Sequence, residues 1–267
     1  MNASSKPKVI SGTKEWGVAN ENCVNGCNHG CRYCYARWNA CDRFGRIAHE
    51  DWENKQVRTK DVKKRRRHFD GQVMFPTTHD ICPDVLGPCL EVIGNILEAD
   101  NDILIVSKPH LECIGAICDK FEGKKDRILF RFTIGATDDD VLGYWEPGAP
   151  KLAERLASLR LAFDRGFRTS VSCEPMLDSD GILGLFSVLE PFVTDSIWIG
   201  KLNKIDKRVR VENDEDRRRV EKIKAGQTDA RIMEIYKALR TEPKVRWKES
   251  VKAVVGLDLP QEAGLDE

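Results

Sequence analysis

The sequence lacks the features by which membrane, secreted and intrinsically disordered proteins are recognised. No apolar run reaches about 18 residues, so no segment predicts a transmembrane helix. The N-terminal segment has no apolar stretch typical of a signal peptide. Neither sign of charge is in excess, because 43 lysines and arginines balance 43 aspartates and glutamates. This balance excludes a globally basic surface, and we expect a cytoplasmic globular protein.

The sequence also lacks internal repeats, low-complexity segments and any strong shift in composition that would mark a domain boundary. A chain of 267 residues with 41% hydrophobic residues can bury a core without disulfide bonds. We therefore predict a single domain over residues 1–267, with a core at residues 15–240 and a C-terminal extension at 241–267.

Cysteine, by contrast, is abundant. The chain has ten cysteines, and five of them lie between positions 23 and 41. In the cytoplasm these thiols are expected to stay reduced. Metal binding or catalysis therefore explains their number better than disulfide pairing does.

Short apolar runs alternate with segments of helical periodicity along most of the chain. Runs typical of buried strands lie at residues 72–77, 102–107, 127–134, 168–173 and 196–200, with a further short run at 244–247. Helical spacing of apolar residues is found at 86–97, 110–121, 152–163, 182–188 and 232–239. This alternation predicts an α/β fold with a parallel sheet of about six strand–helix units. Periodicity alone leaves open a doubly wound sheet or a barrel-like curved sheet.

Three of the clustered cysteines have a spacing that indicates a metal centre. Cys27, Cys31 and Cys34 follow the pattern C-x3-C-x2-C, and Tyr33 directly precedes the last of them. Thiolates are soft ligands that suit iron–sulfur clusters or zinc. A closed structural site takes four protein ligands, whereas three cysteines leave one metal position free for a substrate or cofactor.

The sequence of this loop, GCNHGCRYCYAR, resembles the cluster motif of the radical S-adenosylmethionine (SAM) superfamily, especially its spore photoproduct lyase-related branch. Four later segments are also similar to that branch: TTHD at 77–80, SKP at 107–109, WEPGAP at 145–150 and CEPML at 173–177. The resemblance implies a partial TIM-type (βα)6 barrel with a parallel curved sheet. Its first strand would lie at residues 17–20.

The resemblance also implies the cofactors and the chemistry. A 4Fe–4S cluster would be held by Cys27, Cys31 and Cys34, and its open iron would bind SAM. An electron donor of the flavodoxin or ferredoxin type would reduce the cluster. SAM would then be cleaved to a 5′-deoxyadenosyl radical, which removes a hydrogen atom from the substrate.

Further site residues follow from the same resemblance. The implied cofactor-binding residues are Tyr33, Tyr35, Thr78, Lys108, Thr133 and Glu174, and Lys201 and Asn203 would face the substrate. The lyase carries a hydrogen-donor cysteine at the end of its second strand, where this chain reads Phe-Pro-Thr at 75–77. The catalytic hydrogen donor is therefore unknown, with Cys173 and Cys82 as the candidates.

A local basic run bears on the choice of substrate. Residues 58–68 (RTKDVKKRRRH) include Lys63, Lys64, Arg65, Arg66 and Arg67. Such a run is either a solvated surface or a set of phosphate contacts. Together with the resemblance, it favours a nucleic acid or nucleotide as the substrate of a radical SAM enzyme. A peptide, a protein or a small molecule is the alternative.

A different class of function also fits the cysteine loop. The three cysteines would then form a structural zinc site, completed by Cys23, Cys41 or His29. In that hypothesis the chain is a non-catalytic module that binds nucleic acid through its basic run. The long α/β body speaks against this hypothesis, because a zinc knuckle needs no six-unit barrel.

Overall fold

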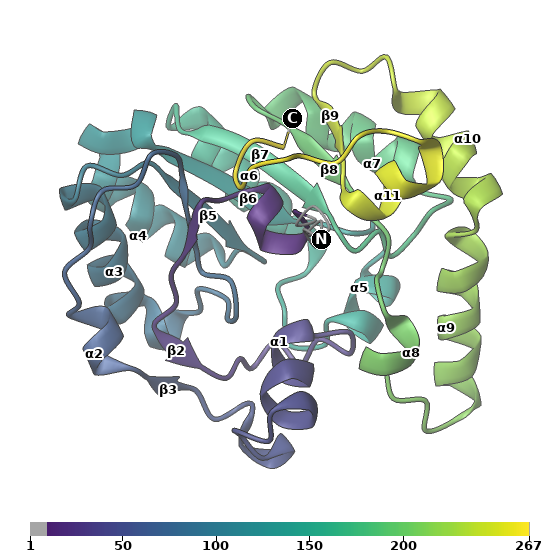
Figure 1. The fold of residues 1–267 in the computed structure, drawn as a ribbon, viewed down its shortest axis with the longest axis horizontal. Helices are drawn as coiled ribbons and strands as arrows, with labels where there is room; N and C mark the ends of the chain where they lie inside the picture. The colour runs from purple at the N-terminus through teal and green to yellow at the C-terminus, as the bar shows by residue number, and fades with distance from the viewer. Residues whose placement is uncertain (1–9, 267) are drawn as a thin grey trace, which may run out of the picture.

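The computed structural model describes residues 10–266 and is built on a seven-stranded parallel sheet (Figure 1). Residues 1–9 and 267, which belong to the predicted single domain, lie outside this description. In spatial order the strands are β1 Ala19–Asn20, β4 Val73–Phe75, β5 Ile103–Ser107, β6 Ile128–Thr133, β7 Arg168–Cys173, β8 Ile197–Ile199 and β9 Val245–Trp247. Each strand is parallel to its neighbours, and in the register Val73 pairs with Ile103 and Ile197 with Val245.

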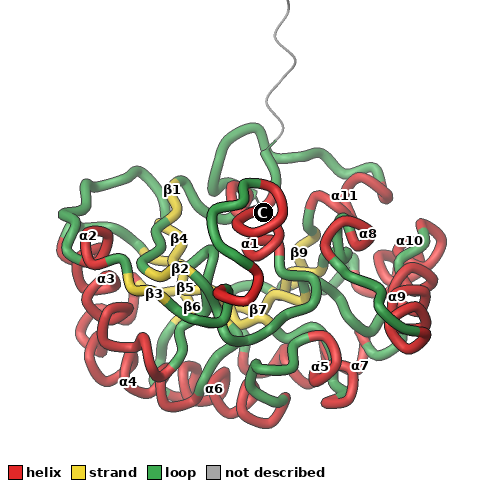
Figure 2. The backbone as a smooth tube through the Cα atoms, turned by 90° about the horizontal axis from the view of Figure 1, so that it is seen from below, coloured by secondary structure: helices red, strands yellow, loops and turns green. Residues whose placement is uncertain are grey.

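The strands follow an arc, and most of the helices lie on its outer side (Figure 2). The helices are α1 Tyr35–Arg37, α2 Thr59–Val62, α3 Leu86–Glu98, α4 Leu111–Phe121, α5 Asp139–Trp145, α6 Leu152–Asp164, α7 Ile182–Leu189, α8 Ile205–Arg208, α9 Asp214–Gly226, α10 Asp229–Leu239 and α11 Glu249–Val255. A separate antiparallel pair, β2 Val24–Asn25 and β3 Gln56–Val57, lies beside the cysteine loop. None of the described helices is long and apolar enough to cross a membrane.

Alternate residues of the central strands face two different layers. In β6, whose residues are all buried, Phe130 and Phe132 join the main hydrophobic core beneath the outer helices. Leu129 faces the inner side and joins a smaller cluster with Trp16 and Trp198. Burial on both faces explains the continuous apolar run that predicted this strand.

The observed sheet confirms the predicted fold class and extends it by one strand. All six strands of the expected partial barrel form, and the sheet stays open between β1 and β9 within the described residues. The short run at 244–247 becomes β9, so the C-terminal extension supplies the last strand. Trp247 of β9 packs its ring at 5.3 Å from the ring of Tyr236 on α10.

Several short elements were not predicted from the sequence. They are α5, α11, the β2–β3 pair and a π-helical turn at Trp38–Arg43. The two strands of the pair have only two residues each, too few for a hydrophobic period to appear. α5 begins after Asp138, whose side chain accepts the N–H of Asp140 at 2.8 Å. An N-cap signal was therefore present in the sequence and was missed.

Candidate functional site

Hydrogen bonds fix the cysteine loop at both ends. The N–H of Cys27 donates to the carbonyl of Trp52 at 2.9 Å. Gly26 has a φ of +88°, and a Cβ built there would lie 2.4 Å from the Trp52 carbonyl oxygen. Only glycine tolerates both that backbone conformation and that close approach. At the other end, Cys34 is the N-cap of α1, and its Sγ accepts the N–H of Arg37 at 3.3 Å.

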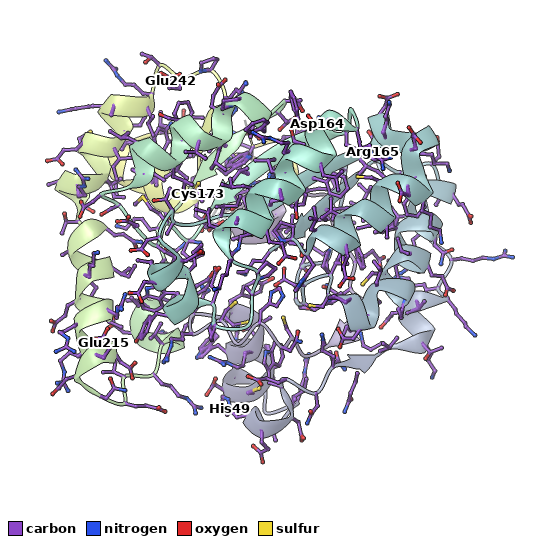
Figure 3. All side chains as sticks on the ribbon, turned by 180° about the vertical axis from the view of Figure 1, so that it is seen from behind. His49, Asp164, Arg165, Cys173, Glu215 and Glu242 are labelled. Atoms are coloured by element: carbon purple, nitrogen blue, oxygen red, sulfur yellow. The ribbon has the colours of Figure 1, made fainter. Side chains whose placement is uncertain are left out.

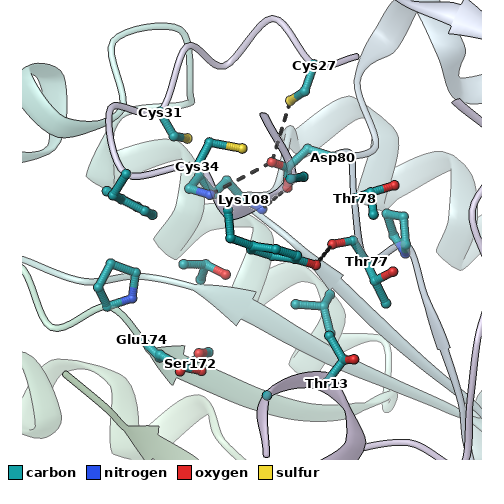
Figure 4. A pocket seen from close by; sticks show the side chains of 18 of the residues that line it. Thr13, Cys27, Cys31, Cys34, Thr77, Thr78, Asp80, Lys108, Ser172 and Glu174 are labelled. Atoms are coloured by element: carbon teal, nitrogen blue, oxygen red, sulfur yellow. Dashed lines mark hydrogen bonds and ion pairs between the residues drawn. The ribbon is translucent and has the colours of Figure 1, made fainter. Parts of the chain in front are cut away.

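The three cysteines line one end of a cavity of about 350 Å³ (Figure 4). In the figure their thiols lie together, with Glu174 and Ser172 toward the opposite end. Every cofactor-binding residue that the resemblance implies also lines this cavity, namely Tyr33, Tyr35, Thr78, Lys108, Thr133 and Glu174, as do Lys201 and Asn203. Apart from those in the cysteine loop, these residues lie at or just beyond the carboxyl ends of parallel strands. Open and closed α/β sheets alike place their ligand sites there.

Burial dominates the electrostatics of two of the thiols, Cys27 and Cys31. Burial, together with the Asp80 charge, raises the pKa of the Cys27 thiol to about 12. Burial also raises the pKa of Cys31 well above its ordinary value. Buried thiols of this kind become thiolates when a bound metal supplies compensating positive charge.

A buried network of charges forms the wall next to the thiols. The Lys108 ammonium lies 3.8 Å from the carboxylate of Asp80 and 4.0 Å from that of Glu146. Glu146 is paired in turn with Arg155 at 2.6 Å, and neither side chain is exposed. Although burial disfavours its charge, the acidic neighbours hold the pKa of Lys108 above its ordinary value. Both distances from Lys108 exceed a hydrogen bond, so these ion pairs leave its N–H groups available to a ligand.

Asp80 connects the cysteine loop to the end of β5. One carboxylate oxygen accepts the backbone N–H of Lys108 at 2.7 Å and the hydroxyl of Ser107 at 2.9 Å. The other lies 3.0 Å from His29 Nδ1. Burial alone would raise the pKa of Asp80, but the charge of Lys108 and the hydrogen bonds from His29 and from the Lys108 backbone hold it well below its ordinary value. Sequence reasoning quoted this residue in TTHD, and Glu146 in WEPGAP, without assigning either a role.

The hydroxyls of both loop tyrosines donate hydrogen bonds to other parts of the protein. Tyr33 donates its hydroxyl to the Glu146 carboxylate, and Tyr35 donates to the Thr77 carbonyl. Burial is the main cause that raises the pKa of each tyrosine, so both stay neutral. Their rings therefore contribute apolar wall to the cavity while their hydroxyls hold neighbouring segments in place.

The opposite end of the cavity is built by the C-terminal extension, which sequence reasoning did not foresee. Lys248 follows β9, and its ammonium lies 3.6 Å from Glu174 and 2.8 Å from Glu15. Burial raises the pKa of the Glu174 carboxyl, although Lys248 opposes this effect. A Cβ at Gly200 would lie 2.9 Å from the side chains of both Glu174 and Lys248, so these groups need a glycine at the end of β8.

The two candidate hydrogen donors lie elsewhere. Cys173 is fully buried in the main hydrophobic core, and Figure 3 shows it in the interior of the molecule. Cys82 is also buried, with its Sγ 3.5 Å from His29 Nε2. Neither is among the described residues that line the cavity. Cys23 and Cys41, two of the proposed fourth zinc ligands, are likewise outside that set.

The basic run contains α2 and the residues just after it, and it does not border the cavity within the described residues. Lys63, Lys64, Arg65 and Arg67 are exposed. Arg66 differs from them, because its side chain is only 1% exposed and its guanidinium lies 3.2 Å from Glu21. It also donates to the carbonyl of Asp61 at 2.6 Å. Lys64 is exposed but lies 3.3 Å from Glu21, so of these five cations Lys63, Arg65 and Arg67 are without an ion pair among the described residues, whereas Arg66 stabilises the fold.

Comparison with known sequences gives one distant relative. No protein-family model matches the chain. An uncharacterized protein of Acidianus two-tailed virus, ORF301, is 24% identical in an alignment of 190 residues that covers 64% of this chain. The chain spans 62% of the length of that viral protein.

Solved structures of spore photoproduct lyase variants give the class of fold. A cysteine-to-alanine variant matches with a TM-score of 0.54 at 17% identity, over 85% of this chain and 75% of that chain. A cysteine-to-serine variant gives the same TM-score and identity over 92% and 78%. The chain therefore has the radical SAM fold, in a form related to that of spore photoproduct lyase. This result confirms the fold that the sequence resemblance implied.

Proposed function

We propose that this protein is a radical SAM enzyme that uses a 4Fe–4S cluster to generate a 5′-deoxyadenosyl radical. One observation carries the proposal: the three cysteines and all six implied SAM-binding side chains line one cavity at the strand ends. The sequence scatters these residues between positions 27 and 174. A zinc knuckle on the cysteine loop would give no reason for the distant residues to gather at the same cavity.

Cys27, Cys31 and Cys34 would hold the cluster. When bound, a reduced cluster of this kind supplies the electron that cleaves SAM. The chain supports it with a loop fixed by Gly26, with the buried thiols of Cys27 and Cys31, and with the half-buried Cys34 at the edge of the cavity. Three thiols from one loop, with no fourth cysteine lining the cavity among the described residues, suit a cluster that keeps one iron open.

The side chains around the cavity would bind and orient SAM. We assign the SAM carboxylate to Lys108, whose ammonium faces the cavity between Asp80 and Glu146. Tyr33 and Tyr35 would pack against the nucleoside, because their rings face the cavity while their hydroxyls are engaged elsewhere.

The remaining implied residues would meet the polar groups of SAM. Thr78 is assigned to the amino group and Thr133 to the ribose, and Glu174 also accepts hydrogen bonds from the cofactor. The walls of the cavity would limit the contact of a radical with water, and the protein's contribution to such chemistry is to position and shield the cofactors.

For the substrate, we propose a nucleic acid or a nucleotide. The exposed cations Lys63, Lys64, Arg65 and Arg67 suit phosphate contacts. A spore photoproduct lyase variant with dinucleoside spore photoproduct has a TM-score of 0.53 to this chain. Lys201 and Asn203 would face the substrate. Neither Cys82 nor Cys173 is among the described residues that line the cavity, so neither is assigned as the hydrogen donor.

The proposal includes a cytoplasmic location, where thiols stay reduced, and a flavodoxin or ferredoxin type of donor. The test is anaerobic reconstitution with iron and sulfide, followed by reduction and addition of SAM. We expect about four irons per chain and a visible band that bleaches on reduction. 5′-Deoxyadenosine should form from SAM.

Matched variants make this test specific. Changing Cys27, Cys31 and Cys34 together to alanine should abolish both the iron and the product. Changing Cys118, a buried cysteine of α4 away from the cavity, to alanine should preserve both. Product formation by the triple variant would overturn the proposal. So would a colourless chain whose only metal is a zinc ion that is lost with the triad.

A further inference from the structure

A second group of metal-ligating side chains lies beside the cysteine loop and outside the cavity. His29 Nε2 lies 2.9 Å from His110 Nε2 and 3.5 Å from Cys82 Sγ. The ligand atoms of these three residues all lie within 4.8 Å of one another. His29 and Cys82 are buried, and the side chain of His110 is 20% exposed.

The spacing of these atoms suits a single ion. Zinc binds histidine nitrogen at about 2.0 to 2.1 Å and cysteine sulfur at about 2.3 Å. In a tetrahedral site these lengths separate two nitrogens by roughly 3.3 Å, and a nitrogen from a sulfur by roughly 3.6 Å. The two separations measured from His29 Nε2 are therefore within about half an ångström of those around one bound ion.

A carboxylate lies near the Nδ1 atom of each imidazole. His29 Nδ1 lies 3.0 Å from the Asp80 carboxylate, and His110 Nδ1 lies 3.8 Å from Glu154. A carboxylate at Nδ1 holds the N–H there and leaves the Nε2 lone pair free for a metal. His29 has this arrangement, whereas Glu154 lies beyond hydrogen-bond distance of His110 Nδ1. The Nε2 atoms of the two imidazoles lie 2.9 Å apart.

Hydrogen bonds among these three side chains do not satisfy all of their donors and acceptors. With its proton on Nδ1, His29 offers one lone pair at Nε2. Both His110 Nε2 and the Cys82 thiol approach that lone pair, so two donors compete for one acceptor. An ion would engage both imidazoles and the sulfur at once, with the Cys82 thiol proton lost to solvent and the His110 Nε2 proton moved through solvent to Nδ1.

We propose that His29, Cys82 and His110 bind a divalent cation of the zinc type, in a site separate from the cysteine triad. Two imidazoles and one thiolate are ligands that zinc prefers. The fourth position belongs to solvent or to Asn28, whose Oδ1 lies 3.5 Å from Cys82 Sγ.

The site would tie three loops together. His29 belongs to the cysteine loop, Cys82 follows β4, and His110 precedes α4. Asp80 contacts both His29 and the backbone of Lys108, so the ion would stiffen the wall of the cofactor cavity. Its role is structural, because none of its three ligands lines the cavity among the described residues.

The experiment titrates Co²⁺ into the metal-free full-length chain in which Cys27, Cys31 and Cys34 are alanine. This background removes the thiolates of the triad, so any sulfur-to-cobalt absorption must come from another cysteine. We expect one tightly bound Co²⁺ per chain, with a thiolate charge-transfer band and the visible bands of a tetrahedral ion. Zn²⁺ should displace it.

Matched variants assign the ligands. In that background, Cys82→Ala should remove the charge-transfer band, and His110→Ala should weaken binding at least tenfold. Cys118→Ala and His68→Ala change a buried cysteine and an exposed histidine away from the site, and both should bind Co²⁺ as the parent does.

Two outcomes would overturn the proposal: no stoichiometric binding by a folded parent, or binding that survives both Cys82→Ala and His110→Ala. If the triple-alanine chain fails to fold by circular dichroism, zinc content is measured in the cluster-loaded chain instead. One zinc per chain, lost in Cys82→Ala and kept in Cys118→Ala, supports the site, and its absence refutes it. The iron content reports on the triad separately, so failure of this proposal is distinct from failure of the proposed enzyme.

Discussion

The side chain of Asp80 binds Lys108 twice, once through the ammonium at 3.8 Å and once through the backbone N–H at 2.7 Å. The two residues follow neighbouring parallel strands, β4 and β5, which end at the same edge of the sheet. The backbone contact fixes the start of the loop, and the ion pair holds the ammonium at the cavity. Lys108 is thus preorganised to meet an anionic ligand.

Replacement of Lys108 should therefore weaken SAM binding. Lys108→Met removes a charged hydrogen-bond donor, and such a bond contributes about 1.5 to 3 kcal/mol. We expect SAM affinity in the reconstituted protein to fall by roughly ten- to hundredfold, as measured by calorimetric titration. Lys222→Met, at an exposed position of α9, should bind SAM as the wild type does. Equal affinity in the two variants would remove Lys108 from the SAM site.

Asp80 should make stability depend on pH in the acid range. Its pKa is lowered in the folded chain, so its contribution is fully present above the unfolded value of about 3.9. It is lost as the pH falls through the lower folded pKa. Asp80→Asn should cost about 3 to 5 kcal/mol at neutral pH, because it leaves buried cations unpaired.

Urea unfolding at several pH values measures this effect. The difference between wild type and Asp80→Asn should stay constant from neutral pH down to about pH 5 and shrink as the pH falls below about 3.9. Asp70→Asn changes a fully exposed aspartate and should show neither effect. A difference that does not change with pH would show that Asp80 acts through packing.

The buried pair of Glu146 and Arg155 should be strongly coupled. Arg155→Met leaves a buried carboxylate without its partner at 2.6 Å, which typically costs about 3 to 5 kcal/mol of unfolding free energy. The double variant Glu146→Gln/Arg155→Met should be destabilised by less than the sum of the single variants. The exposed pair of Arg217 and Asp214 should contribute less than about 1 kcal/mol in the same unfolding measurements. Additive effects at Glu146 and Arg155 would contradict the coupling.

Gly26 should be required for cluster assembly. In Gly26→Ala the new Cβ would approach the Trp52 carbonyl oxygen, and the backbone would keep an unfavourable positive φ. We expect a loss of at least about 1 kcal/mol in stability and a lower iron content after reconstitution. Gly143→Ala, in α5 with open space around it, should leave the iron content unchanged. Normal iron content in Gly26→Ala would show that the loop can move without losing the cluster.

The basic run should bind nucleic acid through its exposed members only. Lys63→Gln/Arg65→Gln/Arg67→Gln should weaken binding to an oligonucleotide and reduce the dependence of affinity on salt, because phosphate contacts release counterions. A control that changes Arg217, Arg218 and Lys222 on α9 to glutamine removes the same charge elsewhere. Arg66 should be kept, because its change would disturb α2 through the contacts with Glu21 and Asp61. Equal binding by the two triple variants would argue against a nucleic-acid substrate.

The sequence alone determined the sheet and the cysteine loop. The strands over residues 102–107 and 127–134 were predictable because burial on both faces demands continuous apolar runs. The cysteine triad was predictable because its three members lie on one short loop, so their spacing can be read directly from the sequence. Lys108 and Glu174 were predicted as site residues from the resemblance to a known family and not from periodicity.

The tertiary structure alone decided which distant residues complete the site. Lys248 reaches Glu174 because β9 joins the sheet beside β8, and no sequence pattern states which strands are neighbours. In the same way, His29, Cys82 and His110 meet only because three loops converge at one edge of the sheet. Local spacing encodes contacts within one loop or helix, whereas contacts between strand ends depend on the order and register of the whole sheet.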